Sequence, residues 1–488
     1  MNQYKPRWLF IAFLALIGPT FVWAYVMHAG LSGDVFWQWA AGHYMWVHHR
    51  IIRRDPFSYS LYGRPWVTEE WGFEVLLAGL VSAVGPVAYW LISAGVGTVA
   101  LALVAGRLRH RSVSWSKIAI ILVFVGLSLM PLIKVRPQTL SYALFAGELW
   151  LLDTIRRRPK LVWVMPLYMA LWTNLHGSFL LGYLIFFLYG VWMFIPVVKG
   201  RFETPKTNLS RKTWGLAFGV SVLASLINPH GFEIWSYAAH VSFSSQISSM
   251  IAEWQSPNFH QHFMMLTIIG PLAVVLLAAE FSAKKPIEWP EFVLLGGMLV
   301  AVLQSVRFLP YYAIEWPVVV AALTPDFEFK RVRSFIGVPV VLALLVYIIG
   351  SQPIRPPGAI GSGVPARAVD YLAQHRSGRV FAMYHWGGYL ISRGFKVFVD
   401  GRTDFYLHSP VLPDYLAVKN LSKNPNPIWA HYRVEYVLWE PNTALATFLS
   451  QDSQQWQEVY VSKNAVIYQH RGIWGIQARE LPLPGGGT

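Results

Sequence analysis

Carboxylates that directly adjoin long apolar runs are the residues of this sequence best placed to do chemistry. Asp34 follows the first apolar run, and Glu69 and Glu70 open another at Trp71. A carboxylate in such a place can act as a general base on a hydroxyl or amide of an acceptor. A helix cap with Gly33 as a hinge explains Asp34 equally well. A glutamate before Trp71 could favour a helix N-terminus, or bind a metal or an acceptor.

Two arginines are candidates for phosphate binding. Arg136 and Arg307 each stand at the end of an apolar run, where a lone guanidinium is costly unless it is paired. A lipid-linked diphosphate or monophosphate would be a suitable counter-ion. An internal carboxylate such as Glu253 or Asp34 is the alternative partner.

A further basic pair, Arg53 and Arg54, falls in the segment that follows the first apolar run. Guanidinium groups bind phosphate well, so this pair could also hold a phosphate. Pairing with Asp55, Glu69 or Glu70, or with lipid headgroups, explains the two arginines without any ligand.

Two histidines occur in similar turns. His176 lies in Asn174-Leu-His-Gly, and His230 lies in Asn228-Pro-His-Gly. Either histidine could act as an acid or base or as a metal ligand. A hydrogen-bonded structural histidine is the alternative in both turns.

In the C-terminal part, Asp400 and Arg402 follow an expected strand. Ligand sites of open α/β sheets lie at the carboxyl ends of strands, so this pair could bind an acceptor or a metal. It could instead belong to a loop network that holds a small domain together.

These residues make up the expected site. The expected catalytic residues are Asp34, Glu70 and His176. The expected substrate-binding residues are Arg53, Arg54, Arg136, Asn174, His230, Glu253, Arg307, Asp400 and Arg402. A divalent metal could take part, but the sequence identifies no ligand set for it. Thiolate ligands and cysteine nucleophiles are excluded because the chain has no cysteine.

The composition indicates the elements that must position this site. The chain has 488 residues, of which 55% are hydrophobic and 13% are charged, against about a quarter charged in soluble proteins. Apolar runs long enough for a membrane-spanning helix alternate with short basic clusters. This pattern predicts a polytopic α-helical membrane protein of about 11 spans. The net charge of +15 is explained by topology and lipid headgroups, not by nucleic acid.

The basic clusters predict the topology. Lys5 and Arg7 place the N-terminus in the cytoplasm, and a large external loop covers residues 29–71. Residues 71–106 could form a hairpin of two crossings, or an interfacial helix over residues 71–84 followed by one span over residues 86–106. The second arrangement is chosen because it places the following basic clusters in the cytoplasm. The cytoplasmic loops are expected to be merely basic, with the polar site residues gathered on the outer side.

A small domain is expected after the membrane part. The membrane domain is predicted to cover residues 1–350, with a last span at 335–349, and a linker to cover 351–365. The rest, 366–488, is predicted to be an extracytoplasmic α/β domain, because short strand patterns alternate with helical ones. The expected strands are residues 379–384, 396–400, 434–439, 458–461 and 465–468.

Several motifs together resemble a known group. They are Asp34-x-x-Trp37, Asp55-Pro-Phe-Ser-Tyr59, Glu70-Trp71, Arg136-Pro-Gln138, Asn174-Leu-His-Gly177, Asn228-Pro-x-Gly231, Glu253-Trp-x-Ser-Pro257, Arg307-x-x-Pro310 and Val399-Asp-Gly-Arg402. With this architecture they resemble the GT-C superfamily of polytopic glycosyltransferases. More closely, they resemble a group of bacterial membrane proteins described as glycosyltransferase-like.

The resemblance implies an activity and a location. Asp34 would be the base in an inverting transfer from a polyprenyl-phosphate-linked sugar to a glycan, lipid or protein acceptor. The reaction would take place at the outer face of the bacterial cytoplasmic membrane, in the cell envelope, with the lipid phosphate on Arg136 or Arg307. GT-C enzymes often have a paired acidic motif in the first loop, but Gly33 precedes Asp34 here. The tail also lacks a Trp-Trp-Asp motif, which argues against an oligosaccharyltransferase and weakens the case for a metal.

Two other classes stay open. A non-catalytic lipid-glycan carrier or flippase needs polar residues through the membrane on both sides, whereas this sequence is expected to place them on one side. A membrane scaffold protein could use the C-terminal domain to dock a partner.

Overall fold

The computed structural model describes residues 7–31, 33–194, 208–244, 252–281, 288–328, 354–375 and 378–472. The predicted last span, residues 335–349, lies outside this part of the chain. The chain divides into two compact units. Unit 1 contains Met1–Ala29 and Pro86–Pro357, and unit 2 contains Gly30–Gly85 and Gly358–Thr488. The segment that contains the predicted external loop therefore shares a unit with the C-terminal segment.

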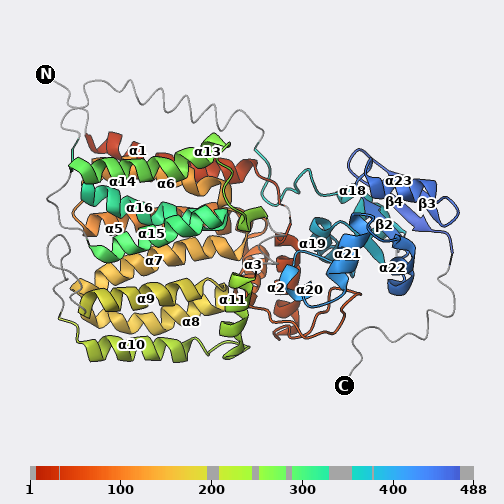
Figure 1. The fold of residues 1–488 in the computed structure, drawn as a ribbon, viewed down its shortest axis with the longest axis horizontal. Coiled ribbons are helices and arrows are strands. Elements are labelled where there is room, and N and C mark those ends of the chain that lie inside the picture. The colour runs from red at the N-terminus through yellow and green to blue at the C-terminus, as the bar shows by residue number, and fades with distance from the viewer. Residues whose placement is uncertain are drawn as a thin grey trace. The chain divides into compact units, whose positions relative to one another are not determined.

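Unit 1 is a bundle of helices. Its principal helices are α1 (Arg7–His28), α5 (Val96–His110), α6 (Trp115–Leu129), α7 (Pro137–Arg157), α8 (Met165–Leu175), α9 (Phe179–Phe194), α10 (Arg211–Ala224), α11 (Glu233–Phe243), α14 (Gly270–Phe281), α15 (Trp289–Gln304) and α16 (Leu309–Leu323). Short helical segments extend or join them: α4 (Val87–Trp90), η1 (Leu91–Gly95), η2 (Met130–Leu132), η3 (Pro159–Val164), η4 (Ala252–Trp254), α13 (His262–Met264), η5 (Met265–Ile269) and η6 (Val306–Phe308). Helices α5, α6, α7 and α16 lie side by side in the bundle (Figure 1).

Small residues allow two of these helices to pack closely. A Cβ on Gly18 of α1 would overlap the backbone oxygen of Leu122 in α6. A Cβ on Gly126 of α6 would lie 2.6 Å from Cα of Gly18. Such close backbone approach is typical of helix pairs in membranes, where van der Waals packing replaces the hydrophobic effect.

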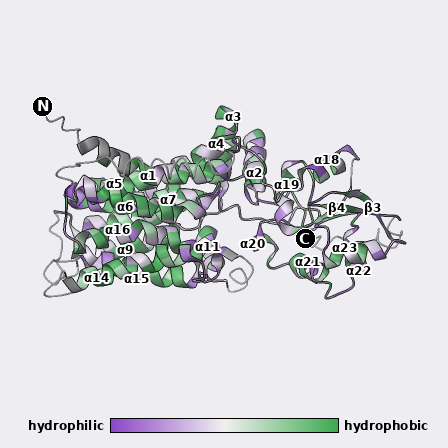
Figure 2. Cartoon of the chain, turned by 90° about the horizontal axis from the view of Figure 1, so that it is seen from above, coloured by the Kyte–Doolittle hydropathy of each residue, from purple (hydrophilic) through white to green (hydrophobic). Residues whose placement is uncertain are grey.

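The surface of unit 1 is apolar, as a bilayer requires. Helices of unit 1 are predominantly hydrophobic along their length (Figure 2), and exposed side chains include Leu167 at 74% and Leu223 at 65%. Within the described residues, four helical stretches are long and apolar enough to cross a membrane: Val87–His110, Trp115–Leu132, His262–Ala279 and Val306–Leu323. The chain is therefore built as a helical membrane protein, but the predicted count of about 11 spans is not confirmed.

The helix break expected before Pro86 is present. Helix α3 (Trp71–Val84) ends there, and the candidate span starts at Val87. The break also separates the two units, since α3 belongs to unit 2. That α3 lies at the membrane interface stays a prediction.

In the part of unit 2 that the structure describes, four strands form a sheet in the order β1-β2-β4-β3. The strands are β1 (Val380–Ala382), β2 (Tyr436–Trp439), β3 (Trp456–Val461) and β4 (Val466–His470). β1 and β2 are parallel, and β4 runs antiparallel to both β2 and β3. Four of the five expected strands are thus confirmed. The fifth, residues 396–400, is not a strand, although Val397 forms isolated bridges to Ser58 and Val380.

Helices cover this sheet. They are α18 (Ala366–Gln374), η7 (Tyr384–Trp386), α19 (Gly387–Ser392), α20 (Thr403–Tyr406), α21 (Val411–Lys419), α22 (Pro425–Tyr432) and α23 (Ala444–Gln451). The N-terminal segment of unit 2 adds α2 (Val35–His48), which packs on α3 and α19. Tyr59 and Leu61 from this segment enter the same apolar core as Phe398 and Trp439. The early and late parts of the chain therefore share one core.

Candidate functional site

The expected site residues are divided between the two units. Unit 2 contains Asp34, Arg53, Arg54, Glu70, Asp400 and Arg402, and unit 1 contains Arg136, Asn174, His176, His230, Glu253 and Arg307. Each group is described within its own unit.

Asp34 stands directly before α2 but does not cap it. Its backbone angles are helical, and its side chain makes no capping hydrogen bond. Nε1 of Trp37, one turn further, donates to Oδ1 of Asp34 at 3.3 Å. The backbone of Gly401 reaches this carboxylate, because a Cβ there would overlap Oδ1 and lie 3.2 Å from Cγ. The simple helix-cap interpretation of Asp34 is therefore wrong.

Glu70 lies beside the same helix. Its Oε2 accepts a hydrogen bond from Nε2 of Gln38 in α2 at 3.2 Å. One turn into α3, Glu74 is buried, and its Oε2 has no hydrogen-bond partner among the described residues. Burial raises the pKa of Glu74 to about 8, with Arg402 acting against the rise, so this carboxyl is mostly protonated at neutral pH. The sequence analysis did not single out Glu74, because it reads as one polar position of an apolar helix.

Arg402 is the centre of a buried ion-pair network. Its Nη1 donates to Oδ1 of Asp55 at 2.7 Å, and its Nη2 donates to Oδ2 of Asp400 at 2.6 Å. The hydroxyl of Tyr406 donates to the same Asp400 oxygen at 2.8 Å. The guanidinium also lies 4.5 Å from the ring centroid of Trp66.

Both partners of this network are closed to solvent. Asp400 is 0% exposed and Arg402 is 1% exposed. Their donors and acceptors are directed at each other and at Asp55, which favours the interpretation of a network that holds the unit together. A substrate-binding role for the pair stays a prediction.

Arg53 and Arg54 lie on the surface of unit 2. Both are exposed, and Nη1 of Arg54 donates to the backbone oxygen of Gly63 at 3.0 Å. Asp55, a partner considered for them, is engaged by Arg402. Phosphate binding by Arg53 and Arg54 therefore remains a prediction.

In unit 1, Arg136 has the internal partner that was considered for it. It stands directly before α7, and its Nη1 lies 2.9 Å from both carboxylate oxygens of Glu253. Nζ of Lys134 lies 2.9 Å from Oε1 of the same residue. Burial raises the pKa of Glu253, but the charges of Arg136 and Lys134 outweigh it and lower the pKa overall. Glu253 is thus an anion shared by two cations.

Arg307 has a different environment. Its Nη2 lies 3.2 Å from Nε2 of His176, and its guanidinium carbon lies 4.6 Å from the ring centroid of Trp254. Among the residues that the structure describes, Arg307 forms no ion pair with a carboxylate. Its guanidinium is therefore held by a ring and an imidazole, and Glu253 acts on it only through longer-range electrostatics.

His176 is a buried, neutral imidazole. Its Nδ1 lies 2.9 Å from Oγ of Ser141 and 2.8 Å from Oγ of Ser178. Arginine can only donate, so Nε2 of His176 accepts from Arg307, and the backbone N–H of Ser178 donates to Nδ1 at 3.1 Å. Burial and the charge of Arg307 hold the pKa of His176 well below its usual range. This geometry makes His176 a support for Arg307.

Asn174 and His230 take part in turns. Nδ2 of Asn174 donates to the backbone oxygens of Ala170 and Ile227, both at 2.8 Å. The backbone N–H of His230 donates to Oδ1 of Asn228 at 2.7 Å. Asn174 thus joins the end of α8 to the turn after α10, and His230 lies in that turn. Substrate binding by either residue stays a prediction.

A buried cluster that was not predicted from the sequence lies near the other end of α7. We call it the arginine cluster; it contains Arg107, Arg111, Arg156, Asp153, Glu288, Glu291 and Glu315. Arg107 lies 2.6 Å from Glu291, 2.8 Å from Glu315 and 3.2 Å from Asp153. The expectation that the basic clusters are merely basic is therefore wrong. The missed signal is the presence of acidic residues in or next to the apolar runs that flank them.

The cluster also corrects the expectation of one-sided polarity. Arg107, Asp153, Glu291 and Glu315 are all buried within unit 1, near the helix ends that were expected to carry only basic residues. A cavity of about 540 Å³ adjoins them, with Arg111, Glu288 and the apolar Val318 and Val319 in its lining.

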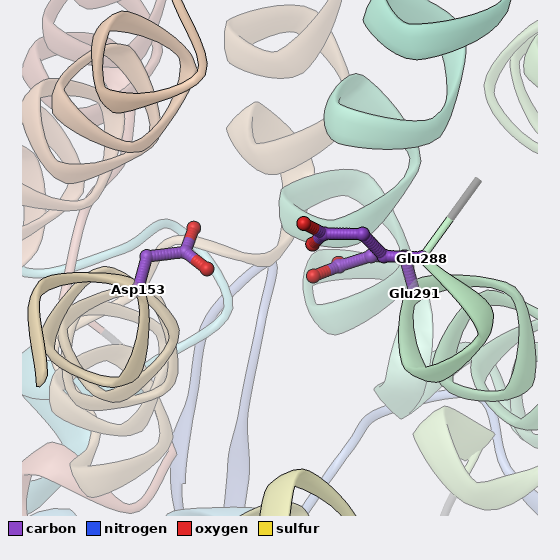
Figure 3. A group of neighbouring side chains, drawn as sticks. All are labelled: Asp153, Glu288 and Glu291. Carbon is purple, nitrogen blue, oxygen red and sulfur yellow. The ribbon is translucent and has the colours of Figure 1, made fainter. Parts of the chain in front are cut away.

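Three carboxylates of the cluster have the spacing of a metal site. Asp153 of α7 points towards Glu288 and Glu291 at the start of α15, and their ligand atoms lie within 4.8 Å of one another (Figure 3). Each carboxylate already accepts from guanidinium groups: Arg111 alone lies 2.7–2.8 Å from all three. A dication at this position would be repelled by these arginines, so the donor set fits guanidinium better than a metal.

Comparison with known proteins supplies a fold relationship. No family model matches the chain, and no curated protein sequence matches it. The oligosaccharyltransferase AglB of the archaeon Archaeoglobus fulgidus, solved with an inhibitory peptide and a dolichol-phosphate, is 12% identical with a TM-score of 0.60. That similarity covers 89% of this chain and 69% of AglB.

Two further structures of an oligosaccharyltransferase from the same organism agree. One is tethered to an acceptor peptide with the NVT sequon, at 12% identity and a TM-score of 0.58, covering 88% of this chain and 68% of that one. The apo form is 13% identical with a TM-score of 0.58, and covers 88% and 69%. At this identity the similarity shows a shared fold: the chain has the fold of these oligosaccharyltransferases, in agreement with the predicted resemblance.

Proposed function

We propose that this chain is a GT-C-type glycosyltransferase that moves a sugar from a polyprenyl-phosphate-linked donor to an acceptor. The reaction would take place at the extracytoplasmic face of the bacterial cytoplasmic membrane. The fold supports a lipid-linked donor, since the similar AglB was solved with a dolichol-phosphate. The observation within the chain that carries the proposal is the environment of Arg307.

Arg307 is the group we assign to the donor phosphate. Its guanidinium is oriented by His176 and by the face of Trp254, and the nearby Glu253 is already shared by Arg136 and Lys134. This end of unit 1 therefore has more positive than negative charge among the described residues. A phosphate would complete it with charge-assisted hydrogen bonds.

Asp34 is the group we assign as the base. It would take the proton from an acceptor hydroxyl or amide as the acceptor atom bonds to the anomeric carbon of the sugar. The bond between that carbon and the phosphate oxygen breaks, and the polyprenyl phosphate leaves with the electron pair. A single displacement of this kind inverts the anomeric centre. Glu70, Arg53 and Arg54 in the same unit are candidates for holding the acceptor.

The test compares glycans in a deletion strain complemented with wild type, Asp34→Asn, Arg307→Gln or the exposed control Lys160→Gln. Lipid-linked and surface glycans are profiled by mass spectrometry at equal protein abundance. Wild type and Lys160→Gln should restore a specific glycan that the other two do not, while its lipid-linked precursor accumulates. Full restoration by both Asp34→Asn and Arg307→Gln would overturn the proposal.

A second candidate is a non-catalytic carrier of lipid-linked glycans. It is favoured by the charged residues buried in unit 1 and by the cavity of about 540 Å³ beside them. In that case Arg307→Gln would abolish movement of the lipid-linked glycan across the membrane, whereas Asp34→Asn would leave it unchanged.

A further inference from the structure

The turn at Gly401 and the carboxylate of Asp34 are in intimate contact, although they lie far apart in the sequence. A Cβ on Gly401 would overlap Oδ1 of Asp34 and would lie 3.0 Å from Nε1 of Trp37. The same Nε1 donates to Oδ1 of Asp34. The carboxylate is thus bounded by an indole on one side and by a bare stretch of backbone on another.

The turn that carries Gly401 is itself held rigidly. The neighbouring residues Asp400 and Arg402 are closed to solvent, and the backbone N–H of Arg402 donates to Oδ1 of Asp400 at 3.0 Å. Arg402 also reaches Asp55 in the early segment of the unit at 2.7 Å. The ion-pair network thus fixes the turn against the same segment of chain that carries Asp34.

We propose that Gly401 is a positioning residue for Asp34, and that the network around Arg402 serves to hold it in place. This inference rests on the proposed function, in which Asp34 is the base. The turn sets where the carboxylate can lie, and only a residue without a side chain leaves room for it. Asp400 and Arg402 then act on the reaction through Gly401, without touching the substrate.

The geometry can be tested without any activity assay, because the chain has no cysteine. In the double variant Asp34→Cys/Gly401→Cys, Sγ at position 34 would take the approximate place of Cγ, 3.2 Å from Cβ at 401. That is within reach of a disulfide. Under mild oxidation, proteolysed protein should contain the two peptides joined, and a reductant should separate them. Asp34→Cys/Gly363→Cys is the control, because nothing lies within 4 Å of a Cβ at 363.

The functional arm uses Gly401→Ala with Gly363→Ala as its matched control. Neither glycine has a positive φ, so alanine strains neither backbone, and only the methyl at 401 meets a neighbour. Membranes of each complemented strain receive increasing amounts of the lipid-linked precursor extracted from the deletion strain. Gly401→Ala should lower the maximal rate of glycan formation by about 100-fold and leave the half-saturating precursor concentration unchanged. Gly363→Ala should match wild type in both.

The outcomes separate the two ideas. A disulfide between 34 and 401, with wild-type rates in Asp34→Asn, would remove Asp34 as the base and leave the geometry intact. A loss in Asp34→Asn with wild-type rates in Gly401→Ala would refute positioning and leave the proposed function. A fall in protein abundance alone, with the rate per molecule unchanged, would show that Gly401 only supports folding and would also refute positioning. Failure of the 34–401 pair to cross-link beyond its control would refute the contact itself.

Discussion

The basic residues near the two ends of α7 differ in how many carboxylate partners they have. Near its C-terminal end, Arg107, Arg111 and Arg156 are paired with the carboxylates of the arginine cluster. Near its start, Lys134 and Arg136 share Glu253, and Arg307 has no carboxylate partner in the described chain. At one end each of these arginines has carboxylate partners, and we call it the balanced end; the other end has excess positive charge.

This difference separates structural charge from charge that is available to a ligand. A buried arginine with several carboxylate partners cannot release them without leaving them unpaired, which is costly. An arginine supported by a neutral histidine and an aromatic face can still form an ion pair with a bound anion. The contrast therefore points to the Arg307 end as the place for an anionic substrate.

The largest effect is expected from removing the centre of the balanced end. Arg107→Met leaves Asp153, Glu291 and Glu315 buried without their common partner, which should cost about 3–5 kcal/mol. The yield of monodisperse protein and its unfolding temperature in detergent measure this. Lys160→Met, at an exposed position, is the control. Equal unfolding temperatures for the two variants would show that the cluster is not structural.

A smaller effect of another kind is expected at the other end. Arg307→Gln should change the unfolding temperature little, because no ion pair is lost, but it should weaken donor binding by about 10- to 100-fold, as for a hydrogen bond to a charged group. Arg136→Gln should lower the unfolding temperature, because it deprives Glu253 of a partner, and should change donor binding little. The half-saturating precursor concentration and the unfolding temperature are measured for both. If Arg136→Gln weakened donor binding more than Arg307→Gln, our assignment of the phosphate would be wrong.

Acid should weaken the pairing of Glu253 with Arg136 and Lys134 before it changes the surroundings of Arg307. Because the pKa of Glu253 is lowered in the folded protein, its pairing adds stability above the ordinary carboxyl range and loses it as pH falls through the lowered pKa. The unfolding temperature of wild type should therefore fall more steeply with acid than that of Glu253→Gln, by an amount typical of half-exposed pairs, about 1 kcal/mol or less. Parallel pH curves would contradict this.

No effect is expected from metal at the arginine cluster. Its carboxylates already accept from guanidinium groups, so neither EDTA nor millimolar Mn²⁺ should move the unfolding temperature. Glu291→Gln tests the assignment: a stabilisation by Mn²⁺ that this variant removes would mean that the balanced end is a metal site after all.

Local sequence patterns predicted much of the fold. Apolar run length identified the helical membrane part, and alternating patterns identified four strands of unit 2, because both follow from the periodicity of a single element. The expected strand at 396–400 is only bridged at Val397, since pairing of an extended segment depends on its neighbours. The pairing of Arg136 with Glu253 was among the alternatives because both residues stand at the ends of apolar runs.

The rest of the site depends on contacts that no local pattern encodes. Arg107 and Glu315 are separated by 208 residues, and the basic character of residues 107–111 was fully explained by topology. Likewise, Gly401 is one small residue in a turn, and its importance arises only where α2 meets it. Reading the sequence alone could propose Asp34, but it could not identify what bounds its carboxylate.

The pairing of Asp55 with Arg402 also has a consequence for how the protein is made. After Asp55 a ribosome must add 347 residues to reach Arg402, which at about 5–20 residues per second takes on the order of half a minute. During that time Asp34 and Asp55 have been synthesised, but Arg402 and Gly401 do not yet exist. The proposed base is therefore completed only after Gly401 and Arg402 have been translated, and a chain terminated before them would insert its helices without acquiring a finished catalytic centre.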